Sequence, residues 1–372
     1  MSQNFDVIVI GAGIVGASVA ARLIPTHRVA LVETEAQAGY HTTGRSAAIW
    51  VRNYGPPDVR LLTGLSCEFY KNPPEDIGTD YLAVDRSILY LAPQDQGSHL
   101  DALIAQDLGI EEIPVAKAKA LCPAIIDGYA TRAALESDGF DMDVAGLHQY
   151  FLRKLRQGGG QLLLRHRAGR IERKHRAWAV QTSGGLMINA PIVVNAAGAW
   201  GDEVAEIAGL APIGLVPCRR TAAIIDPAPF QVEHWPMVQS AAHDWYVRAE
   251  ARTKLMVTPC DETPDTPHDV QPDELDVAIG IDRMQQALDI DVKRVEHSWA
   301  GLRTFTPDRS LAFGYDNALE GFFWAVGQGG YGIQTAPAAS ALIAAMVKHE
   351  DPGPAVGILP DIDPMRFRPR RR

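Results

Sequence analysis

Three glycines near the start of the chain have a spacing that suits the binding of a dinucleotide. Gly11, Gly13 and Gly16 lie in the segment GAGIVG. In such a segment the first glycine allows a tight turn, the second lets a pyrophosphate approach the backbone, and the third lets a helix pack closely against a strand. Glu33 follows 22 residues after Gly11, where a carboxylate can accept the hydroxyls of a ribose. Because an acid here disfavours a 2′-phosphate, these residues predict the ADP part of FAD or NAD rather than NADP.

The elements that must position these residues occur in the required order. A short β-branched run at 6–10 predicts a parallel strand buried on both faces, and residues 17–23 have the composition of a helix. A second apolar strand at 28–32 ends at Glu33. The start of the helix offers free N–H groups and the positive end of its dipole to phosphates. Together these elements predict a Rossmann-like unit.

Two further glycine-containing turns and one loop favour FAD over NAD. The loop 39–48 is small and rich in hydroxyl groups, and the apolar strand at 192–195 runs into small residues that leave room for a ligand. The segment 327–335 is a glycine-dense turn from a strand to an alanine-rich helix, which is another helix start that can bind an anion. At a flavin this turn could stabilise the negative charge that develops on reduction. Several such turns predict a long cofactor that lies across a sheet.

The motifs along the chain carry a family resemblance. The segments GAGIVGAS, GYHTTGRSAA, PCRR, HDWY, VVNAAGAW, WAGLRTFTPD and GQGGYGIQTAP together resemble the D-amino-acid oxidase-like FAD-dependent oxidoreductases. The likeness runs nearly from end to end, and within the family it is greatest to the bacterial D-arginine dehydrogenases. The resemblance implies FAD that is bound without a covalent link. It also implies that Ala168 contacts the adenine end through its backbone.

The glycine turns and the resemblance together define a predicted set of FAD-binding residues. The set comprises Gly11, Ala12, Gly13, Ile14, Gly16, Glu33, Thr34, Thr43, Gly44, Arg45, Ser46, Ala47, Ala48, Ala168, Ala196, Ala197, Gly198, Trp200, Arg303, Gly329, Gly330, Tyr331, Gly332, Ile333 and Gln334.

Two arginines are the predicted anchors for a substrate carboxylate. The planar guanidinium grips a carboxylate with two hydrogen bonds, and Arg220 and Arg303 match the anchoring arginines of the family. Tyr54 and Tyr246 match hydroxyl groups that hold the carboxylate or line the pocket, and Gly330 matches a backbone carbonyl that faces the substrate amine. Hydride transfer from a neutral amine needs no strong protein base, so we assign none.

The sequence departs from the family pattern where an arginine-selective enzyme holds the substrate side chain. The position of a glutamate that pairs with the guanidinium reads Ser87 or Ile88, a loop histidine is replaced by Ile49, and an acid upstream of the pocket tyrosine is replaced by His243. Removing the carboxylate that pairs with a buried cation costs on the order of 3–5 kcal/mol of binding free energy for that cation. We therefore expect poor activity on D-arginine and D-lysine. An apolar D-amino acid would suit Ile49, Trp50 and Ile88. A substrate with a polar or acidic side chain remains an alternative because of Arg52 and His243.

The positions of these motifs predict the domain organisation. The fold class is α/β, with a discontinuous Rossmann-like FAD-binding domain and a substrate-binding domain built on an antiparallel sheet with helices. The FAD-binding domain is predicted at 1–77, 141–214 and 298–372, and the substrate-binding domain at 78–140 and 215–297. The Pro/Asp/Thr-rich stretch 259–272 is predicted to be a loop over the site.

Composition limits the other classes of function. The 372 residues carry a net charge of −10, which argues against a broad nucleic-acid or anionic-membrane surface. We find no secretory signal and no membrane-spanning run, so a cytoplasmic protein is expected. The four cysteines are far apart and form no metal-binding pattern with histidine, so no metal is expected.

The predicted reaction is the FAD-dependent oxidative deamination of a D-amino acid. A hydride passes from Cα to flavin N5, and the imine is then hydrolysed to a keto acid and ammonia. The alternatives are a secondary amine such as sarcosine, glycine, or a 2-hydroxy acid as the donor. A flavoprotein that senses or binds without turnover is disfavoured, because the carboxylate anchors are complete. The sequence leaves open whether a quinone or O₂ reoxidises the flavin.

Overall fold

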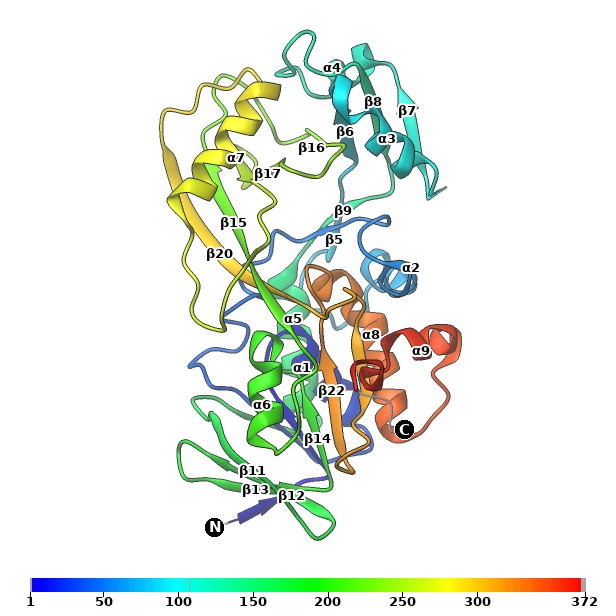
Figure 1. The fold of residues 1–372 in the computed structure, drawn as a ribbon, viewed down its shortest axis with the longest axis vertical. Helices are drawn as coiled ribbons and strands as arrows, with labels where there is room; N and C mark the ends of the chain where they lie inside the picture. The colour runs from blue at the N-terminus through cyan, green and yellow to red at the C-terminus, as the bar shows by residue number, and fades with distance from the viewer. Residues whose placement is uncertain (1, 107, 369–372) are drawn as a thin grey trace.

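A six-stranded sheet lies at the centre of the half of the molecule that contains both termini (Figure 1). The computed structural model describes residues 2–106 and 108–368. Four-residue apolar runs such as VIVI and VALV form buried strands, as expected for a sheet covered on both faces. Neighbouring strands are parallel except at the β22–β21 edge. Their order is β10 (Gln161–Leu163), β3 (Val29–Val32), β2 (Val7–Ile10), β14 (Ile192–Asn195), β22 (Phe322–Val326) and β21 (Ala312–Tyr315).

The two faces of this sheet are covered by different layers. Val7 and Val9 of β2 belong to a core shared with helices, and Ile8 and Ile10 point into a second core, as the alternation of a strand requires. The helices of the first layer are α1 (Ile14–Leu23), α2 (Pro57–Lys71), α5 (Val144–Gln157) and α8 (Gly332–Lys348). The second layer consists of α6 (Gly201–Ile207) and a four-stranded sheet of β1 (Ser2–Asn4), β13 (Met187–Ala190), β12 (Ala177–Thr182) and β11 (Ala168–Lys174).

A nine-stranded sheet forms the other half of the molecule (Figure 1). The predicted antiparallel sheet is confirmed except at one pair, because β16 and β6 run parallel. This parallel pair joins two segments that are far apart in the chain. The strand order is β19 (Thr263–Pro264), β15 (Val216–Ile225), β18 (Lys254–Thr258), β17 (Tyr246–Glu250), β16 (Met237–Ser240), β6 (Ile88–Ala92), β8 (Arg132–Glu136) and β7 (Ile110–Ile113), with β20 (Val295–Phe305) also paired to β15.

Shorter elements complete this half and the junction. The helices beside the large sheet are α3 (Gly97–Ile104), α4 (Val115–Leu121) and α7 (Glu274–Ala287), which begins where the Asp273 carboxylate accepts the Leu275 N–H. A three-stranded sheet joins β4 (Ile49–Trp50), β9 (Phe140–Met142) and β5 (Ala83–Asp85). The C-terminal part includes the short helix α9 (Leu359–Ile362). The exact domain limits stay a prediction.

Two long strands connect the halves. β15 and β20 pair along nearly their whole length, and Figure 1 shows them running from the large sheet toward α6 and β22. Arg220 lies in β15 and Arg303 in β20. A long antiparallel ladder therefore positions both predicted carboxylate anchors.

Candidate active site

The turn between β2 and α1 has room for glycine only. Gly11 has a φ of +99°, and a Cβ there would lie 2.5 Å from the Ala196 carbonyl oxygen. A Cβ on Gly16 would lie 1.8 Å from the carbonyl oxygen of Gly11. The backbones of the turn, of α1 and of the segment after β14 thus approach one another more closely than any other side chain allows. The Thr43 hydroxyl accepts the N–H of Ile14 at 3.0 Å, at the start of the helix.

Glu33 lies directly after β3 at the carboxyl edge of the sheet. Its carboxylate accepts the Ala12 N–H at 2.8 Å and the Glu35 N–H at 2.9 Å. An ionised carboxylate has about four lone-pair sites, so two of them remain for hydroxyl donors. The side chain lines the large cavity described next, as its predicted role requires.

A cavity of about 500 Å³ extends along this edge of the sheet. It runs past the ends of β2, β3 and β14, which is where open α/β sheets bind ligands. Three segments from distant parts of the chain meet around it, at 10–15, 196–200 and 328–333. The predicted FAD-binding residues that line it are Gly11, Gly13, Ile14, Glu33, Thr34, Thr43, Arg45, Ser46, Ala47, Ala168, Ala196, Ala197, Gly198, Trp200, Arg303, Gly329, Gly330, Gly332 and Ile333.

Four predicted FAD-binding residues lie behind the cavity wall instead. The Ala12 N–H is already bound to Glu33, and Gly16 is pressed against Gly11. The Gly44 N–H closes its own loop by donating to the Gly39 carbonyl oxygen at 2.8 Å. The Tyr331 ring is buried against Tyr54 and Phe305. These residues shape the cavity rather than face it.

The cavity has the features that FAD requires. The glycine cradle at Gly11 would fill if it carried a Cβ, the wall is made largely of small residues, and helix α8 starts beside Gly330. Arg45 is held in place, because its guanidinium donates to the carbonyl oxygens of Val270 and Ala300 and pairs with Asp269. Phosphates would lie at the turn after β2 and the ribose at Glu33, which leaves the flavin end toward Gly330.

The two predicted anchoring arginines meet beyond the flavin end of the cavity. In the β15–β20 ladder Arg220 pairs with Gly301, and Arg303 pairs with Cys218. Arg303 donates from Nη1 to the Tyr54 hydroxyl at 2.8 Å, and no ion pair to a carboxylate forms at Arg303 within residues 2–106 and 108–368. The structure thus brings Arg220, Arg303, Tyr54, Tyr246 and Gly330 to the walls of two adjoining cavities.

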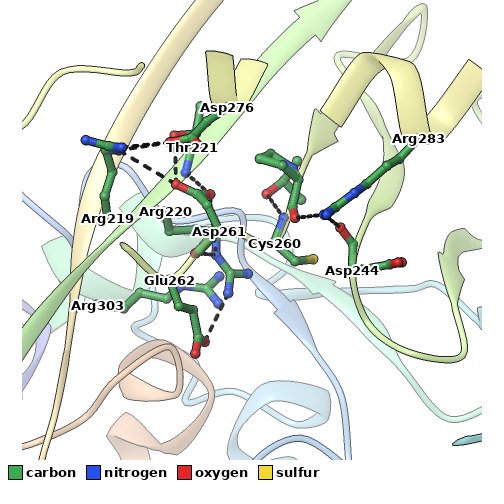
Figure 2. A network of polar contacts seen from close by, with 12 residues as sticks. Arg219, Arg220, Thr221, Asp244, Cys260, Asp261, Glu262, Asp276, Arg283 and Arg303 are labelled. Atoms are coloured by element: carbon green, nitrogen blue, oxygen red, sulfur yellow. Dashed lines mark hydrogen bonds and ion pairs between the residues drawn. The ribbon is translucent and has the colours of Figure 1, made fainter. Parts of the chain in front are cut away.

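Arg220 is buried and only partly satisfied. Its Nε donates to the Asp261 carbonyl oxygen at 2.8 Å, and its Nη2 lies 3.2 Å from Glu262. The remaining Nη1 is buried and has no hydrogen-bond partner in the described part of the chain. Figure 2 shows Arg303 beside Arg220, with Glu262 below both. Glu262 also pairs with Arg309, and the buried Asp261 carboxylate lies 3.9 Å from the Nε of Arg220, whereas Arg303 forms no ion pair within the described residues.

A second cavity of about 140 Å³ opens from the same place. It shares Tyr246, Arg303 and Gly330 with the large cavity. Burial raises the pKa of Tyr246, so its hydroxyl stays a hydrogen-bond donor at neutral pH. The second cavity has apolar walls from Ile49, Val51, Leu103, Met142 and Met237, and polar groups from Ser46, Asn53, Tyr54, Tyr90, Gln239, Ser240, His243 and Gln334. Ala48, a predicted FAD-binding residue like Gln334, lies here and not in the large cavity.

The predictions for the side-chain pocket hold only in part. Ile49 and His243 line the second cavity. Trp50 follows Ile49 in β4, points the other way and stacks on Phe140, so it is core. Ile88 is fully buried two residues before Tyr90, on the same face of β6, but it does not line the cavity, and Ser87 lies at a separate surface hollow. Arg52 is bound to Asp138 outside the cavity.

Sequence reasoning missed five polar residues of this region. They are Asn53, Tyr90, Gln239, Ser240 and the buried Glu136, whose carboxylate accepts the Tyr90 hydroxyl. Tyr90 and Gln239 lie at paired positions of β6 and β16, and no local pattern reveals this parallel pairing. No motif marks Glu136. Metal and membrane features are absent from the residues described: no group of three or more His, Cys, Asp and Glu is placed to hold a metal ion, and no helix has both the length and the apolar character to cross a bilayer.

Known proteins resemble this chain in sequence and in fold. The family model DAO, FAD dependent oxidoreductase, matches residues 6–346. A bovine (Bos taurus) protein, FAD-dependent oxidoreductase domain-containing protein 1, is 27% identical over 182 residues, which cover 43% of this chain and 36% of that protein. The chain therefore matches little more than a third of the length of this relative.

Two solved structures share the fold across nearly their whole length. L-proline dehydrogenase from P. horikoshii superposes with a TM-score of 0.84 at 22% identity, covering 99% of this chain and 98% of that one. Glycine oxidase from Geobacillus kaustophilus superposes with a TM-score of 0.83 at 20% identity, covering 94% of this chain and 96% of that one. At such identities the likeness carries the fold and not the substrate. Because the family model spans most of the sequence and the cavity suits its cofactor, the chain belongs to the DAO family of FAD-dependent oxidoreductases.

Proposed function

We propose that the protein oxidises a D-amino acid at its amine-bearing carbon. One observation carries the proposal: the buried Arg220, which has no partner on Nη1 in the described residues, and the half-buried Arg303, which donates to a tyrosine hydroxyl, converge where two cavities meet. Glu262 and Asp261 lie beside Arg220, whereas Arg303 forms no ion pair within the described residues, and such a cation is costly to enclose unless a ligand pairs with it. A carboxylate is the ligand that best fits this pair.

The residues around the arginines suit the remaining parts of an amino acid. The carboxylate would lie between Arg303 and Arg220, with the hydroxyls of Tyr54 and Tyr246 as further donors. The Gly330 carbonyl would accept an N–H of the neutral amine, and the second cavity would take the side chain. Bound FAD supplies the hydride acceptor. Loss of a hydride from Cα and a proton from the amine leaves an imine, which water converts to a keto acid and ammonia.

The second cavity does not favour a cationic side chain. A cationic side chain there would be buried near the charges of Arg220 and Arg303, and the buried Glu136 already accepts the Arg52 N–H at 3.0 Å and the Tyr90 hydroxyl at 2.7 Å. We therefore infer poor turnover of D-arginine and D-lysine.

A secondary amine is the second candidate substrate. The carboxylate anchors would serve sarcosine, glycine or a cyclic amino acid equally well, and the L-proline dehydrogenase that shares the fold acts, by its name, on such an amine. A 2-hydroxy acid would fit the same anchors. The products distinguish these cases: ammonia with a keto acid, an aldehyde from an N-methyl group, or a keto acid alone.

Anaerobic mixing of the purified holoprotein with single donors tests the proposal. The panel contains D- and L-amino acids, sarcosine, L-proline and 2-hydroxy acids, and the readout is bleaching of the oxidised flavin band. We expect D-amino acids to bleach the flavin with release of ammonia. Bleaching only by sarcosine, proline or a hydroxy acid would move the protein to the second candidate. A colourless protein that does not take up added FAD would overturn the assignment. Reoxidation by O₂ or a quinone is then measured on the reduced protein.

A further inference from the structure

A chain of hydrogen bonds runs along one wall of the second cavity. Tyr90 of β6 and Gln239 of β16 are paired neighbours in the parallel ladder. The Tyr90 hydroxyl donates to Oε2 of Glu136 at 2.7 Å, and Glu136 is fully buried. Burial and the neighbouring Glu136 carboxylate raise the pKa of Tyr90, and Gln239 acts in the opposite direction, as a side chain that turns its amide nitrogen toward the phenolic oxygen does. Since Tyr90 uses its only proton on Glu136, it can only accept from the Nε2 of Gln239.

The direction of these hydrogen bonds determines which ring nitrogen of His243 carries the proton. With its nitrogen toward Tyr90, Gln239 presents its Oε1 to Nδ1 of His243 at 2.7 Å. An amide oxygen only accepts, so Nδ1 carries the imidazole proton and Nε2 keeps a lone pair. Burial, reinforced by the charges of Arg220 and Arg303, lowers the pKa of His243 to about 3, so the ring is neutral at any ordinary pH.

Unpaired polar atoms therefore remain in the cavity. His243 Nε2, which is an acceptor, and both amide atoms of Asn53, the acceptor Oδ1 and the donor Nδ2, are buried and have no hydrogen-bond partner in residues 2–106 and 108–368. Both residues line the second cavity, whose volume of about 140 Å³ is close to that of an engineered cavity of about 150 Å³ that holds benzene. A buried acceptor that stays unpaired when a ligand fills the site is costly.

We propose that the second cavity selects substrates whose side chain is small, uncharged and carries an O–H or N–H donor, and that His243 Nε2 accepts its hydrogen bond. Hydroxyl and carboxamide side chains have this chemistry. The inference rests on the proposed function, because it takes the second cavity as the place of the amino-acid side chain.

The other side-chain classes fit the wall less well. An acidic side chain could accept from Asn53 Nδ2 but would set its lone pairs against that of His243 Nε2. A cationic one would be buried near the charges of Arg220 and Arg303. An apolar one matches Leu103 and Met237 but leaves both acceptors unpaired. Only a neutral donor satisfies the apolar and the polar walls together.

Isosteric pairs of substrates test the inference on the unmodified holoenzyme. D-threonine is compared with D-valine, and D-asparagine with D-leucine, by stopped-flow reduction of the flavin, which yields the dissociation constant and the reduction rate separately. We expect the donor-bearing member to be favoured by on the order of 10- to 100-fold, mainly in the dissociation constant. If the L-enantiomers prove to be the donors, the same pairs are used in that form.

Substitution of His243 isolates its role. In His243→Phe the ring remains but the acceptor is lost, so the preference within each pair should fall to about one. His234→Phe makes the same change on an exposed histidine outside the cavity and should leave the preference intact. A wild-type preference for valine and leucine would overturn the inference even if His243→Phe did not fold. Absence of reduction by every amino acid would instead contradict the proposed function.

Discussion

Arg303 and Tyr54 form the best-defined contact at the proposed carboxylate position. The guanidinium is planar and can hold a carboxylate with one edge while it donates to Tyr54 with Nη1. A lysine keeps the charge but offers no second parallel donor. We therefore expect Arg303→Lys to raise the dissociation constant of every carboxylate-bearing donor by about 10- to 100-fold, as the loss of a charged hydrogen bond implies.

The matched control for this prediction is Arg252→Lys. The Arg252 side chain is 80% exposed and lies 3.6 Å from Glu233, so this variant should bind donors as the wild type does. Binding in Arg303→Lys that equals the wild type would remove Arg303 from the carboxylate site. The readout is the saturation curve of the flavin reduction rate.

His243 should also make stability depend on pH. Its pKa is lowered by burial from 6.5 to about 3, so between these values the unfolded chain binds more protons than the folded one. The contribution of His243 to the free energy of unfolding is therefore fully present above pH 6.5 and is lost as the pH falls below that value. Arg220, Arg303, Tyr54 and Tyr246 are the charged and titratable groups that surround the ring.

We expect the free energy of unfolding to fall by up to about 1.4 kcal/mol per pH unit below pH 6 because of His243. His148, whose pKa burial also lowers, changes stability with pH in the same direction. Denaturant unfolding at pH 7, 6 and 5 measures the slope, and His243→Phe should lower it while His234→Phe should not. Equal slopes in all three proteins would show that His243 does not stay neutral in the folded chain.

The convergence of Arg220 and Arg303 was predictable from single residues, and the lining of the second cavity was not. The two arginines stand in recognisable motifs, and their role as carboxylate anchors stays a prediction. Trp50 lies in the core because one position along a strand decides which face a residue takes, whereas Ile88 shares the face of Tyr90 but does not line the cavity. Glu136 and Asn53 act through contacts between distant segments, for which local sequence holds no signal.

At the scale of the elements, the turn between β2 and α1 depends on close backbone contact. In Gly16→Ala the new Cβ would fall 1.8 Å from the Gly11 carbonyl oxygen, so α1 must move away from the sheet. Overpacking of this kind costs about 1–3 kcal/mol. We expect a lower melting temperature and a dissociation constant for FAD at least tenfold higher, measured by flavin fluorescence during titration of the apoprotein.

Gly64→Ala is the control for a glycine within a helix. Gly64 lies in α2, and a Cβ there would meet nothing within 4 Å among the described residues. Alanine is a better helix former than glycine by about 1 kcal/mol, so this variant should be slightly more stable and bind FAD normally. If Gly16→Ala behaved like Gly64→Ala, the close approach would not matter for the cofactor.

The sequence predicted the elements around the cofactor better than those around the substrate. The run 6–10 and the glycines after it specify a strand, a turn and a helix through local rules, and β2 and α1 follow them. The strands of the large sheet were also detectable by their alternation. Their order was not, because the parallel pairing of β16 with β6 joins residues that are about 150 positions apart and depends on packing.

At the scale of the whole molecule, the cofactor cavity is lined by segments from across the chain. Residues from 10 to 333 contribute to its walls, so occupancy by FAD should stabilise the fold as a unit. A ligand that binds only the folded state raises the free energy of unfolding by about 2.7 kcal/mol at a concentration of 100 times its dissociation constant. We expect the apoprotein to melt at a lower temperature than the holoprotein and to regain stability in proportion to the logarithm of added FAD. A melting temperature independent of FAD would contradict the cavity assignment.

The ladder between β15 and β20 has a consequence for chirality. It sets the spacing of Arg220 and Arg303 by backbone pairing, so the fold fixes the proposed position of the substrate carboxylate. The flavin end of the large cavity fixes the direction of the Cα hydrogen, and the second cavity fixes the direction of the side chain. When the carboxylate, the hydrogen and the side chain are all fixed around Cα, only one enantiomer can turn its hydrogen toward the flavin. The enzyme should therefore distinguish enantiomers by geometry alone. Moving the second cavity, with the arginines unchanged, would reverse which enantiomer the enzyme accepts.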